Sequence, residues 1–228
     1  MPYGMHSLNR CYNGCMNQRT LVIANAFLIG IAFVIGIFLF PGLPAQMADH
    51  WSALGKTDGT LPKAWGVFLL PAIMLLLLCV SLLLPKIDPM HQNVKQFRTS
   101  YQNFFFWIGV FLFYVYLLTL GWNLGWRFSM LAALIPAFAA LWFIVGVLLA
   151  RVKRNWFVGI RTPWTMESEL VWDKTHRLGS LLFRISAGIM LLALFVPQYT
   201  LWILLAPIAL SIIACVVYSY IEYRRERV

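Results

Sequence analysis

The strongest constraint on this chain is its series of apolar runs, each about 20 residues long, the length that crosses a bilayer core of about 30 Å as a helix. Six runs are predicted as membrane spans, over 21–40, 62–84, 103–120, 128–150, 179–196 and 201–221. The runs are continuous rather than alternating, which favours helices over barrel strands. The sequence therefore predicts an all-α fold, a polytopic membrane helix bundle with six transmembrane helices.

Basic residues give the predicted orientation, because Lys and Arg are retained on the cytoplasmic side of a membrane. They cluster before the first span, between the second and third, between the fourth and fifth, and after the sixth. The opposite segments hold only Lys56, Lys63 and Arg127. Both termini are therefore predicted to be cytoplasmic. This rule and the attraction to anionic headgroups explain the net charge of +10, so no direct nucleic-acid partner is expected.

The spans and loops predict three regions. The first is a cytoplasmic N-terminal tail, 1–20, and the second is a two-helix region, 21–102, with an outer loop at 41–61. The third is a four-helix region, 103–228, which contains a polar cytoplasmic segment at 151–178. Within the tail, Cys11 and Cys15 beside His6 form an incomplete zinc set, so the simpler reading is a tail without a metal.

The outer loop has apolar residues at helical spacing. Pro44 is expected to open a short helix at the membrane surface, since Met47, Trp51 and Leu54 recur at intervals of four and three. The dipeptide at 58–59, Asp-Gly, then predicts a turn.

Three polar residues of the same loop admit two readings. Asp49, His50 and Asp58 are weak candidates for a metal-binding or proton-sensing cluster facing the exterior. The alternative is that His50 is a structural hydrogen-bonding residue and that the loop is a cap or a docking surface.

The polar segment contains clear helix signals. Pro163 excludes a helix through 161–162, because the residue before a proline is pushed out of the α region, and Gly159 predicts a bend. Thr165 is expected to be an N-cap, with acidic residues in the first turn that follows. A helix from about Met166 is then expected to continue without a break into the fifth span.

On that helix, six polar residues fall within an arc of roughly 100°. They are Glu169, Asp173, His176, Arg177, Ser180 and Arg184. The alignment favours an inward-facing polar cavity for Arg184, the deepest of them, over the alternative in which its side chain snorkels to the headgroups.

Two further readings of this region stay open. Glu169, Asp173 and His176 have a metal-like spacing, but an Asp173–Arg177 pair at i, i+4 explains the same pattern as helix support. The aromatic residues Trp156, Phe157, Trp164 and Trp172 are either interfacial anchors or a stacked wall for a polar pocket.

Two stretches resemble a known family. The sequence NWFVGIRTPWTMESELVWDKTHRLGSLLFRISAG, residues 155–188, resembles the C-terminal signature of SdpI-type immunity proteins. The outer stretch LPAQMADHWSALGKTDGTLPK, residues 43–63, is similar to the uncharacterised domain that commonly precedes that signature. The matched inner residues are Asn155, Gly159, Arg161, Thr162, Pro163, Trp164, Thr165, Trp172, Thr175, His176 and Arg177, and the matched outer residues are His50, Trp51, Gly55, Asp58 and Gly59.

The resemblance implies a bacterial or archaeal inner-membrane protein that protects its producer against a secreted toxic peptide. A well-known member of the family is also a signalling receptor that holds a cognate transcriptional repressor at the membrane, so the implied partners are lipid, the toxic peptide and a cytoplasmic repressor. The cytoplasmic binding residues are then the inner set together with Asp173 and Arg184.

No cofactor and no catalytic residue is expected, because the sequence has no Ser-His-Asp order, zincin motif or phosphate-cradling loop. Two alternatives remain. One is a small-molecule or ion transporter, or an intramembrane enzyme, that uses the polar stripe from Glu169 to Arg184. The other is a scaffold whose polar segment locks the fourth and fifth spans to the inner leaflet.

Overall fold

The computed structural model describes residues 17–52 and 55–227. All six predicted spans are helices, and each is long and apolar enough to cross a membrane. They are α1 (Gln18–Leu39), α2 (Lys63–Ile87), α4 (Arg98–Asn123), α5 (Met130–Leu149), α7 (Glu169–Met190) and α8 (Thr200–Glu226). The predicted multi-pass helix bundle is therefore confirmed, whereas Cys11, Cys15 and His6 lie outside the described residues.

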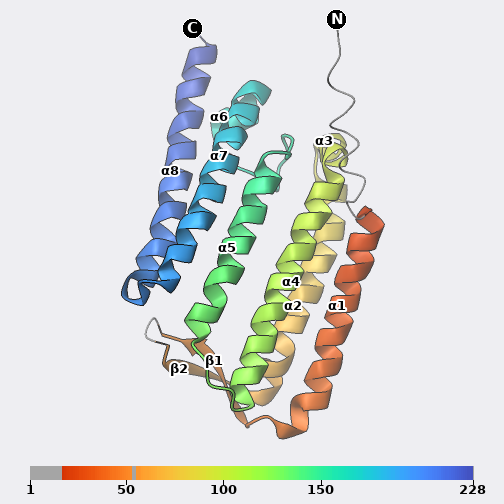
Figure 1. Cartoon of the computed structure of the whole chain (residues 1–228). Helices are drawn as coiled ribbons and strands as arrows, with labels where there is room; N and C mark the ends of the chain where they lie inside the picture. Colours follow the sequence, from red (N-terminus) through yellow and green to blue (C-terminus); the bar gives the residue numbers. More distant parts are fainter. Residues whose placement is uncertain (1–16, 53–54, 228) are drawn as a thin grey trace, which may run out of the picture.

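Short elements lie at the two ends of this bundle (Figure 1). The helices α3 (His91–Gln96) and α6 (Pro163–Glu167) lie at the end where α1 begins and α8 finishes, which we call the signature end. Strands β1 (Gln46–Trp51) and β2 (Thr57–Pro62) lie at the other end, which we call the hairpin end. The described residues also form three 3-10 turns, η1 (Phe40–Gly42), η2 (Leu191–Leu194) and η3 (Pro197–Tyr199).

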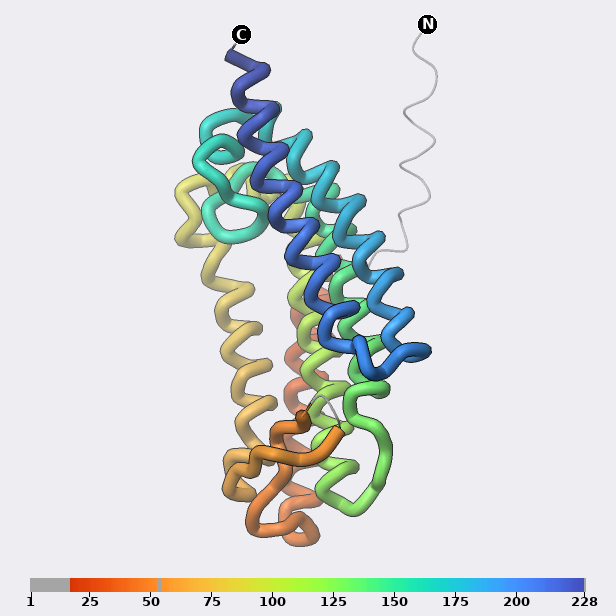
Figure 2. Tube along the Cα trace, turned by 90° about the vertical axis from the view of Figure 1, so that its left-hand side faces the viewer, coloured from red at the N-terminus to blue at the C-terminus, as the bar shows by residue number. Residues whose placement is uncertain are grey.

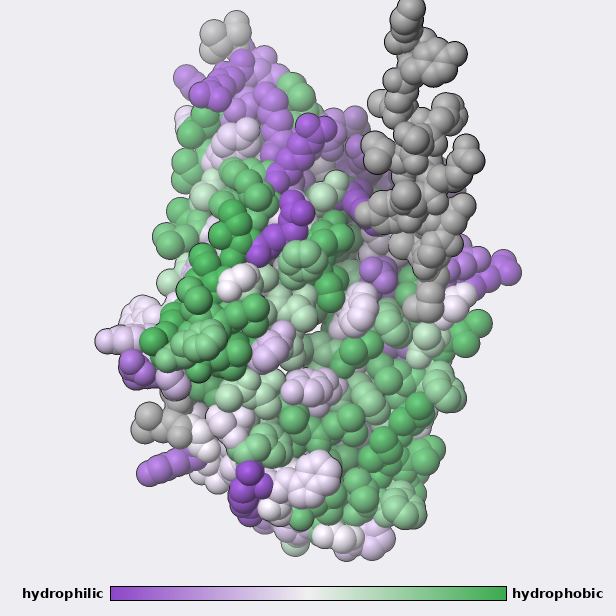
Figure 3. All heavy atoms as spheres, in the orientation of Figure 1, coloured by the Kyte–Doolittle hydropathy of each residue, from purple (hydrophilic) through white to green (hydrophobic). Residues whose placement is uncertain are grey.

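The six long helices pack in two groups of three. Helices α1, α2 and α4 contact one another, α7 packs between α5 and α8, and the contact between α4 and α5 joins the groups. The turn between α7 and α8 stops short of the level of the hairpin (Figure 2). Hydrophobic residues cover the middle of the visible face, and hydrophilic residues gather at the signature end (Figure 3), as expected for a chain whose middle meets lipid.

Within the described residues, the bundle has two buried cores. One core lies among α1, α2, α4 and the hairpin, and includes Met47, Met74 and Tyr116, which are at most 1% exposed. The other core lies at the signature end, where residues of α3, α4, α5 and α7 surround Trp172. The second core packs the polar segment 151–178 against the first half of the chain.

The expected short helix in the outer loop is wrong: the segment is an antiparallel hairpin. Met47 pairs with Leu61 and is fully buried, and Gly55, between the two strands, has φ +75°. Asp58 and Gly59 lie within β2 instead of forming the turn. Three apolar residues at helical spacing were too few to outweigh the pairing of two short strands.

The expected continuous helix from Met166 is also wrong. Thr162 is the N-cap of α6 and Pro163 its first residue, and Ser168 then interrupts the helix and caps α7. Thr165 is the third residue of α6, where its hydroxyl accepts from the N–H of Thr162 and completes a capping box. The predicted non-helical 161–162 is confirmed, and Gly159 bends the chain with φ +124°.

Candidate functional site

The polar segment begins with a tight loop built on Asn155, which is 1% exposed. Its side-chain amide donates to the carbonyls of Lys153 and Val158, both at 2.8 Å. Its oxygen accepts from the N–H groups of Phe157 at 2.9 Å and Val158 at 2.7 Å. All four hydrogen-bonding positions of the amide are thus used, and the loop conformation depends on this one side chain.

His176 of α7 supports the next part of the segment. Its Nε2 accepts a hydrogen bond from the N–H of Ile160 at 2.9 Å, and its Nδ1 lies 2.8 Å from the carbonyl of Trp172. A backbone N–H only donates and a carbonyl only accepts, so the ring is the neutral tautomer that carries its proton on Nδ1. The Trp172 ring stacks on it at 4.0 Å, and both side chains are almost completely buried.

Gly159 provides the space for this contact. A Cβ placed on it would lie 2.5 Å from Nε2 of His176 and 3.0 Å from the Trp172 ring, and its φ of +124° is one that residues with a side chain rarely adopt. The predicted bend therefore has a specific cause, which is the close approach of the backbone to two buried rings.

The α6 segment is fixed to α8 by its hydroxyl and aromatic residues. Thr162 and Ser219 are both buried, and their hydroxyl oxygens lie 3.1 Å apart. Thr165 is fully buried and donates to the carbonyl of Ile160 at 2.8 Å. Trp164 packs against Tyr220 with ring centroids 5.1 Å apart. These contacts hold the RTPWT motif on the end of the last helix.

Charged groups close the end of α6. Arg154 donates to the carbonyls of Met166 and Glu167, both at 3.1 Å, at the C-terminus of α6, where a cation is favourable. The Glu167 carboxylate accepts from the Tyr223 hydroxyl and pairs with Arg227. These two contacts, the tyrosine hydrogen bond first, hold the pKa of the Glu167 carboxyl below its usual value.

Two residues that sequence reasoning missed connect the segment to the first half of the chain. Asp88, which follows α2, is 3% exposed and accepts from the N–H of Trp156 at 3.1 Å and of Met90 at 2.7 Å. Asn93 of α3 donates to the carbonyl of Arg154 at 2.8 Å. Asp88 is the only acidic residue between the second and third spans, and that isolation among basic residues was an available signal.

We expect Asp88→Ala to lower the free energy of unfolding by about 2 kcal/mol, because it leaves two partly buried N–H groups, those of Met90 and Trp156, without an acceptor. Thermal unfolding of the purified full-length protein in detergent measures this loss. Asp49→Ala, which removes an exposed carboxylate, serves as the control and should leave the midpoint unchanged. Equal midpoints for the two variants would contradict the role given to Asp88.

The predicted polar stripe of α7 divides into two environments. His176 and Ser180 are buried, whereas Glu169, Arg177 and Arg184 are exposed. The expected Asp173–Arg177 pair does not form, because Asp173 lies 3.6 Å from Lys153 of the preceding loop. The inward-facing cavity for Arg184 is wrong as well: its Nε donates at 2.9 Å to the carbonyl of Ser180, one turn nearer the signature end. That direction is the one the snorkelling alternative predicted.

The aromatic residues of the segment are likewise partly exposed and partly buried. Trp156 and Phe157 are 49% and 38% exposed, as expected of interfacial anchors, whereas Trp172 is buried against His176. Thr175 is fully buried, and its hydroxyl has no hydrogen-bond partner among the described residues. Arg161 is exposed, and its guanidinium donates to the carbonyl of Trp156.

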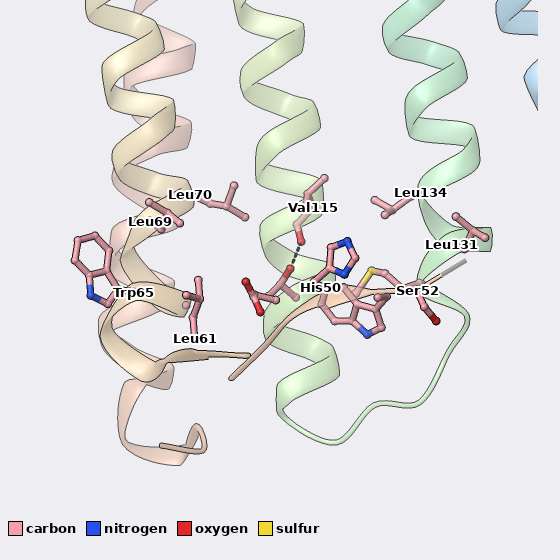
Figure 4. A pocket seen from close by; sticks show the side chains of 14 residues that line it. His50, Ser52, Leu61, Trp65, Leu69, Leu70, Val115, Leu131 and Leu134 are labelled. Carbon is pink, nitrogen blue, oxygen red and sulfur yellow. Dashed lines mark hydrogen bonds between the residues drawn. The ribbon is translucent and has the colours of Figure 1, made fainter. Parts of the chain in front are cut away.

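The hairpin end contains a second feature, an apolar groove with a volume of about 400 Å³ (Figure 4). Residues of β1, β2, α2, α4 and α5 line it, and we call it the outer groove. Leu69 and Leu70 of α2 face Leu131 and Leu134 of α5 across the groove, and Trp65 lies at its edge. Asn123 holds the hairpin in place, since its side chain accepts from the Ala48 N–H at 2.8 Å and donates to the Ala48 carbonyl at 3.0 Å.

The outer-loop residues predicted from sequence lie beside this groove. His50 and Asp58 lie 2.6 Å apart across the two strands, and Trp51 packs edge-on against Trp122 of α4. Gly59 allows β1 to approach, because a Cβ on it would lie 2.8 Å from that of His50.

The weak metal candidates receive no support from this geometry. Within residues 17–52 and 55–227, no three His, Cys, Asp or Glu side chains gather so that they could hold a metal ion. His50 and Asp58 pair without Asp49 as a third ligand. Glu169 and Asp173 instead pair with Arg154 and Lys153, respectively.

Comparisons with known proteins agree with the two sequence resemblances. Residues 151–219 match the SdpI/YfhL protein family, and residues 27–75 match a domain of unknown function (DUF1648). The immunity protein SdpI of Bacillus subtilis (strain 168) is 23% identical over 204 residues, which cover 89% of this chain and 96% of that protein. No solved structure gives a significant match. The chain therefore carries a domain of the SdpI/YfhL protein family in its C-terminal part, preceded by a DUF1648 domain.

Proposed function

We propose that this chain is a membrane immunity protein, which protects the cell that makes it against a secreted toxic peptide. The observation that carries the proposal is the likeness to the B. subtilis immunity protein SdpI along 89% of the chain, together with the six apolar helices. The hairpin lies within the matched residues 27–75, and α6 with the first turns of α7 lies within the matched residues 151–219.

We further propose that the toxic peptide contacts the outer groove. The groove is open and mostly apolar, and it lies between a hairpin and three helices at the end opposite the basic loops. A peptide that attacks membranes has an apolar face, and burial of such a face in a preformed groove is a common mode of peptide recognition. Trp65 is 62% exposed at the edge of the groove and is available to a ligand.

The first experiment deletes the gene in its host and challenges the cells with the cognate peptide. Deletion should make the cells sensitive, and the full-length chain should restore survival. Unchanged survival of the deletion strain would rule out immunity as the function of this chain.

We expect Trp65→Ala to weaken protection about tenfold, because tryptophan is enriched among the residues whose truncation costs more than about 1 kcal/mol at an interface, and about 1.4 kcal/mol is tenfold in affinity. Trp202→Ala is the matched control: Trp202 is 74% exposed in the first turn of α8 and does not line the groove. The minimum inhibitory concentration of the peptide, at equal protein abundance, measures the effect. Equal loss in both variants would argue against the groove as the contact site.

We also propose a signalling role, in which the signature end holds a transcriptional repressor at the membrane once the peptide is bound. The exposed Arg161 and Trp156 provide a basic and aromatic surface for such a partner. This role requires the signature end to lie on the cytoplasmic side of the inner membrane. The distribution of basic residues predicts the same orientation.

The predicted orientation has its own test in a variant without native cysteines. The cysteine of a Lys56→Cys substitution, in the hairpin, should react with a membrane-impermeant maleimide in intact cells. The cysteine of a Lys95→Cys substitution, in α3, should react only after the cells are permeabilised. The reverse pattern of labelling would contradict the orientation with both termini in the cytoplasm.

The alternatives from the sequence, a transporter or an intramembrane enzyme, depend on a polar stripe with reactive groups. Both ring nitrogens of His176 are engaged by the backbone, which leaves the imidazole no free position for proton transfer. Arg184 points along α7 toward the signature end. No specific observation favours either alternative over immunity.

A further inference from the structure

A polar pocket lies at the signature end, and its volume is about 310 Å³. It lies between the end of α5, the first turns of α7 and the start of α4. Its lining includes the buried apolar side chains of Phe97 and Leu149. Its polar lining includes Gln96, Ser100, Arg151, Lys153, Asp173 and Arg177, together with His176 of the loop contact described above, and we call it the basic pocket.

Positive charge dominates the described lining of this pocket. Arg151, Lys153 and Arg177 face a single carboxylate, that of Asp173, and this carboxylate lies 3.6 Å from Lys153. Among the described residues, Arg177 forms no ion pair, and its side chain is exposed. The pocket therefore offers an anion a cationic partner that no described carboxylate neutralises.

Arg184 extends the same charged surface toward the middle of the membrane. It lies seven residues after Arg177, two helical turns along the same face of α7 and about 10 Å deeper. Figure 3 shows hydrophilic residues that continue from the signature end down the front of the molecule over α5 and α7. A cation exposed at that depth is costly unless an anion or water reaches it.

We propose that the basic pocket binds the phosphate group of an anionic phospholipid in the leaflet that meets the signature end. The phosphate lies between Arg177, Lys153 and Arg151, and the hydroxyl of Ser100 and the amide of Gln96 provide neutral donors. The acyl chains extend toward the middle of the membrane along α5 and α7, past Arg184. Basic pockets between spanning helices bind the headgroups of anionic lipids in other membrane proteins.

The position of the pocket favours a lipid over a soluble phosphate. The pocket opens where the apolar part of α5 ends at Leu149 and Ala150, which is the depth of the headgroups in a bundle of this length. Each Lys or Arg near a membrane surface strengthens the binding of an anionic lipid about fivefold. The site is independent of the proposed immunity function, and its test requires no toxic peptide.

The test uses the full-length protein in nanodiscs of phosphatidylcholine, alone or with phosphatidylglycerol. Native mass spectrometry counts the phosphatidylglycerol retained, and the thermal midpoint reports the stabilisation. Arg177→Gln should weaken the retention of phosphatidylglycerol about fivefold, and Arg177→Lys, which keeps the charge, should restore most of it. Lys86→Gln is the matched control, since Lys86 is exposed in the last turn of α2 and does not line the pocket.

A second substitution is expected to change lipid retention in the opposite direction. Asp173→Asn removes the carboxylate of the lining and should strengthen the retention of phosphatidylglycerol about fivefold. Equal retention by Arg177→Gln and Lys86→Gln would overturn the site, as would weaker retention by Asp173→Asn. Free glycerol phosphate is added in a separate arm with phosphatidylcholine alone. If it raises the midpoint as much as phosphatidylglycerol does, the pocket binds a soluble phosphate and the lipid assignment is overturned.

Discussion

Gly159→Ala is expected to lower the free energy of unfolding by about 4 kcal/mol, since backbone strain and overpacking each cost about 1–3 kcal/mol. The new Cβ would lie 2.5 Å from Nε2 of His176 and 3.0 Å from Trp172. Two causes add, because the backbone φ of +124° disfavours any side chain and both rings are held in a packed core. Thermal unfolding of the purified protein in detergent measures the loss.

Gly30→Ala is the matched control for this substitution. Gly30 lies within α1, and a Cβ on it meets nothing within 4 Å. Alanine favours a helix over glycine, so this variant should be as stable as the original chain or slightly more stable. A Gly159→Ala protein with an unchanged midpoint would contradict the close approach of the 155–160 loop to α7.

His176→Ala is expected to destabilise the protein by a similar amount, about 4 kcal/mol, from the loss of a buried ring and of an acceptor. The N–H of Ile160 would lose its acceptor, and a cavity would open beside Trp172. His176→Gln should recover part of the loss, because its amide oxygen can reach the position of Nε2. The thermal midpoint and the abundance in the membrane report the effect.

The control for His176 is His91→Ala. His91 is exposed at the start of α3, and its Nε2 lies 3.1 Å from the Gln92 amide nitrogen. Its removal should change stability by less than about 0.5 kcal/mol. If the His176→Ala and His91→Ala proteins have the same thermal midpoint, His176 does not stabilise the loop. A role of His176 in binding would then replace the structural one.

Local features of the sequence predicted several parts of the signature end. Pro163 excluded a helix before it, and its fixed φ makes it a natural first residue for α6. Gly159 predicted a bend, which its positive φ confirms. The resemblance at 155–188 also indicated the right family, because the motif is dense and its residues are those whose hydrogen bonds shape the loop.

Other parts depended on residues that are distant along the chain. The hydrogen bond from Trp156 to Asp88 joins residues 68 apart, and that between Thr162 and Ser219 joins residues 57 apart. Spacing rules consider windows of a few turns and contain no information about such pairs. The same reason explains why Asp173 was expected to pair with Arg177 on its own helix, whereas Lys153 of the preceding loop lies against it.

The sequence by itself determined the six spans, because a stretch of about 20 apolar residues has few structures other than a helix in lipid. It also determined where the polar segment lies and where its backbone bends. Only the tertiary structure decided that the outer loop is a hairpin, that Asp88 links the two halves, and that Arg184 turns toward the signature end. Each of these depends on which surfaces meet when the helices pack, a property of the whole bundle that no local pattern contains.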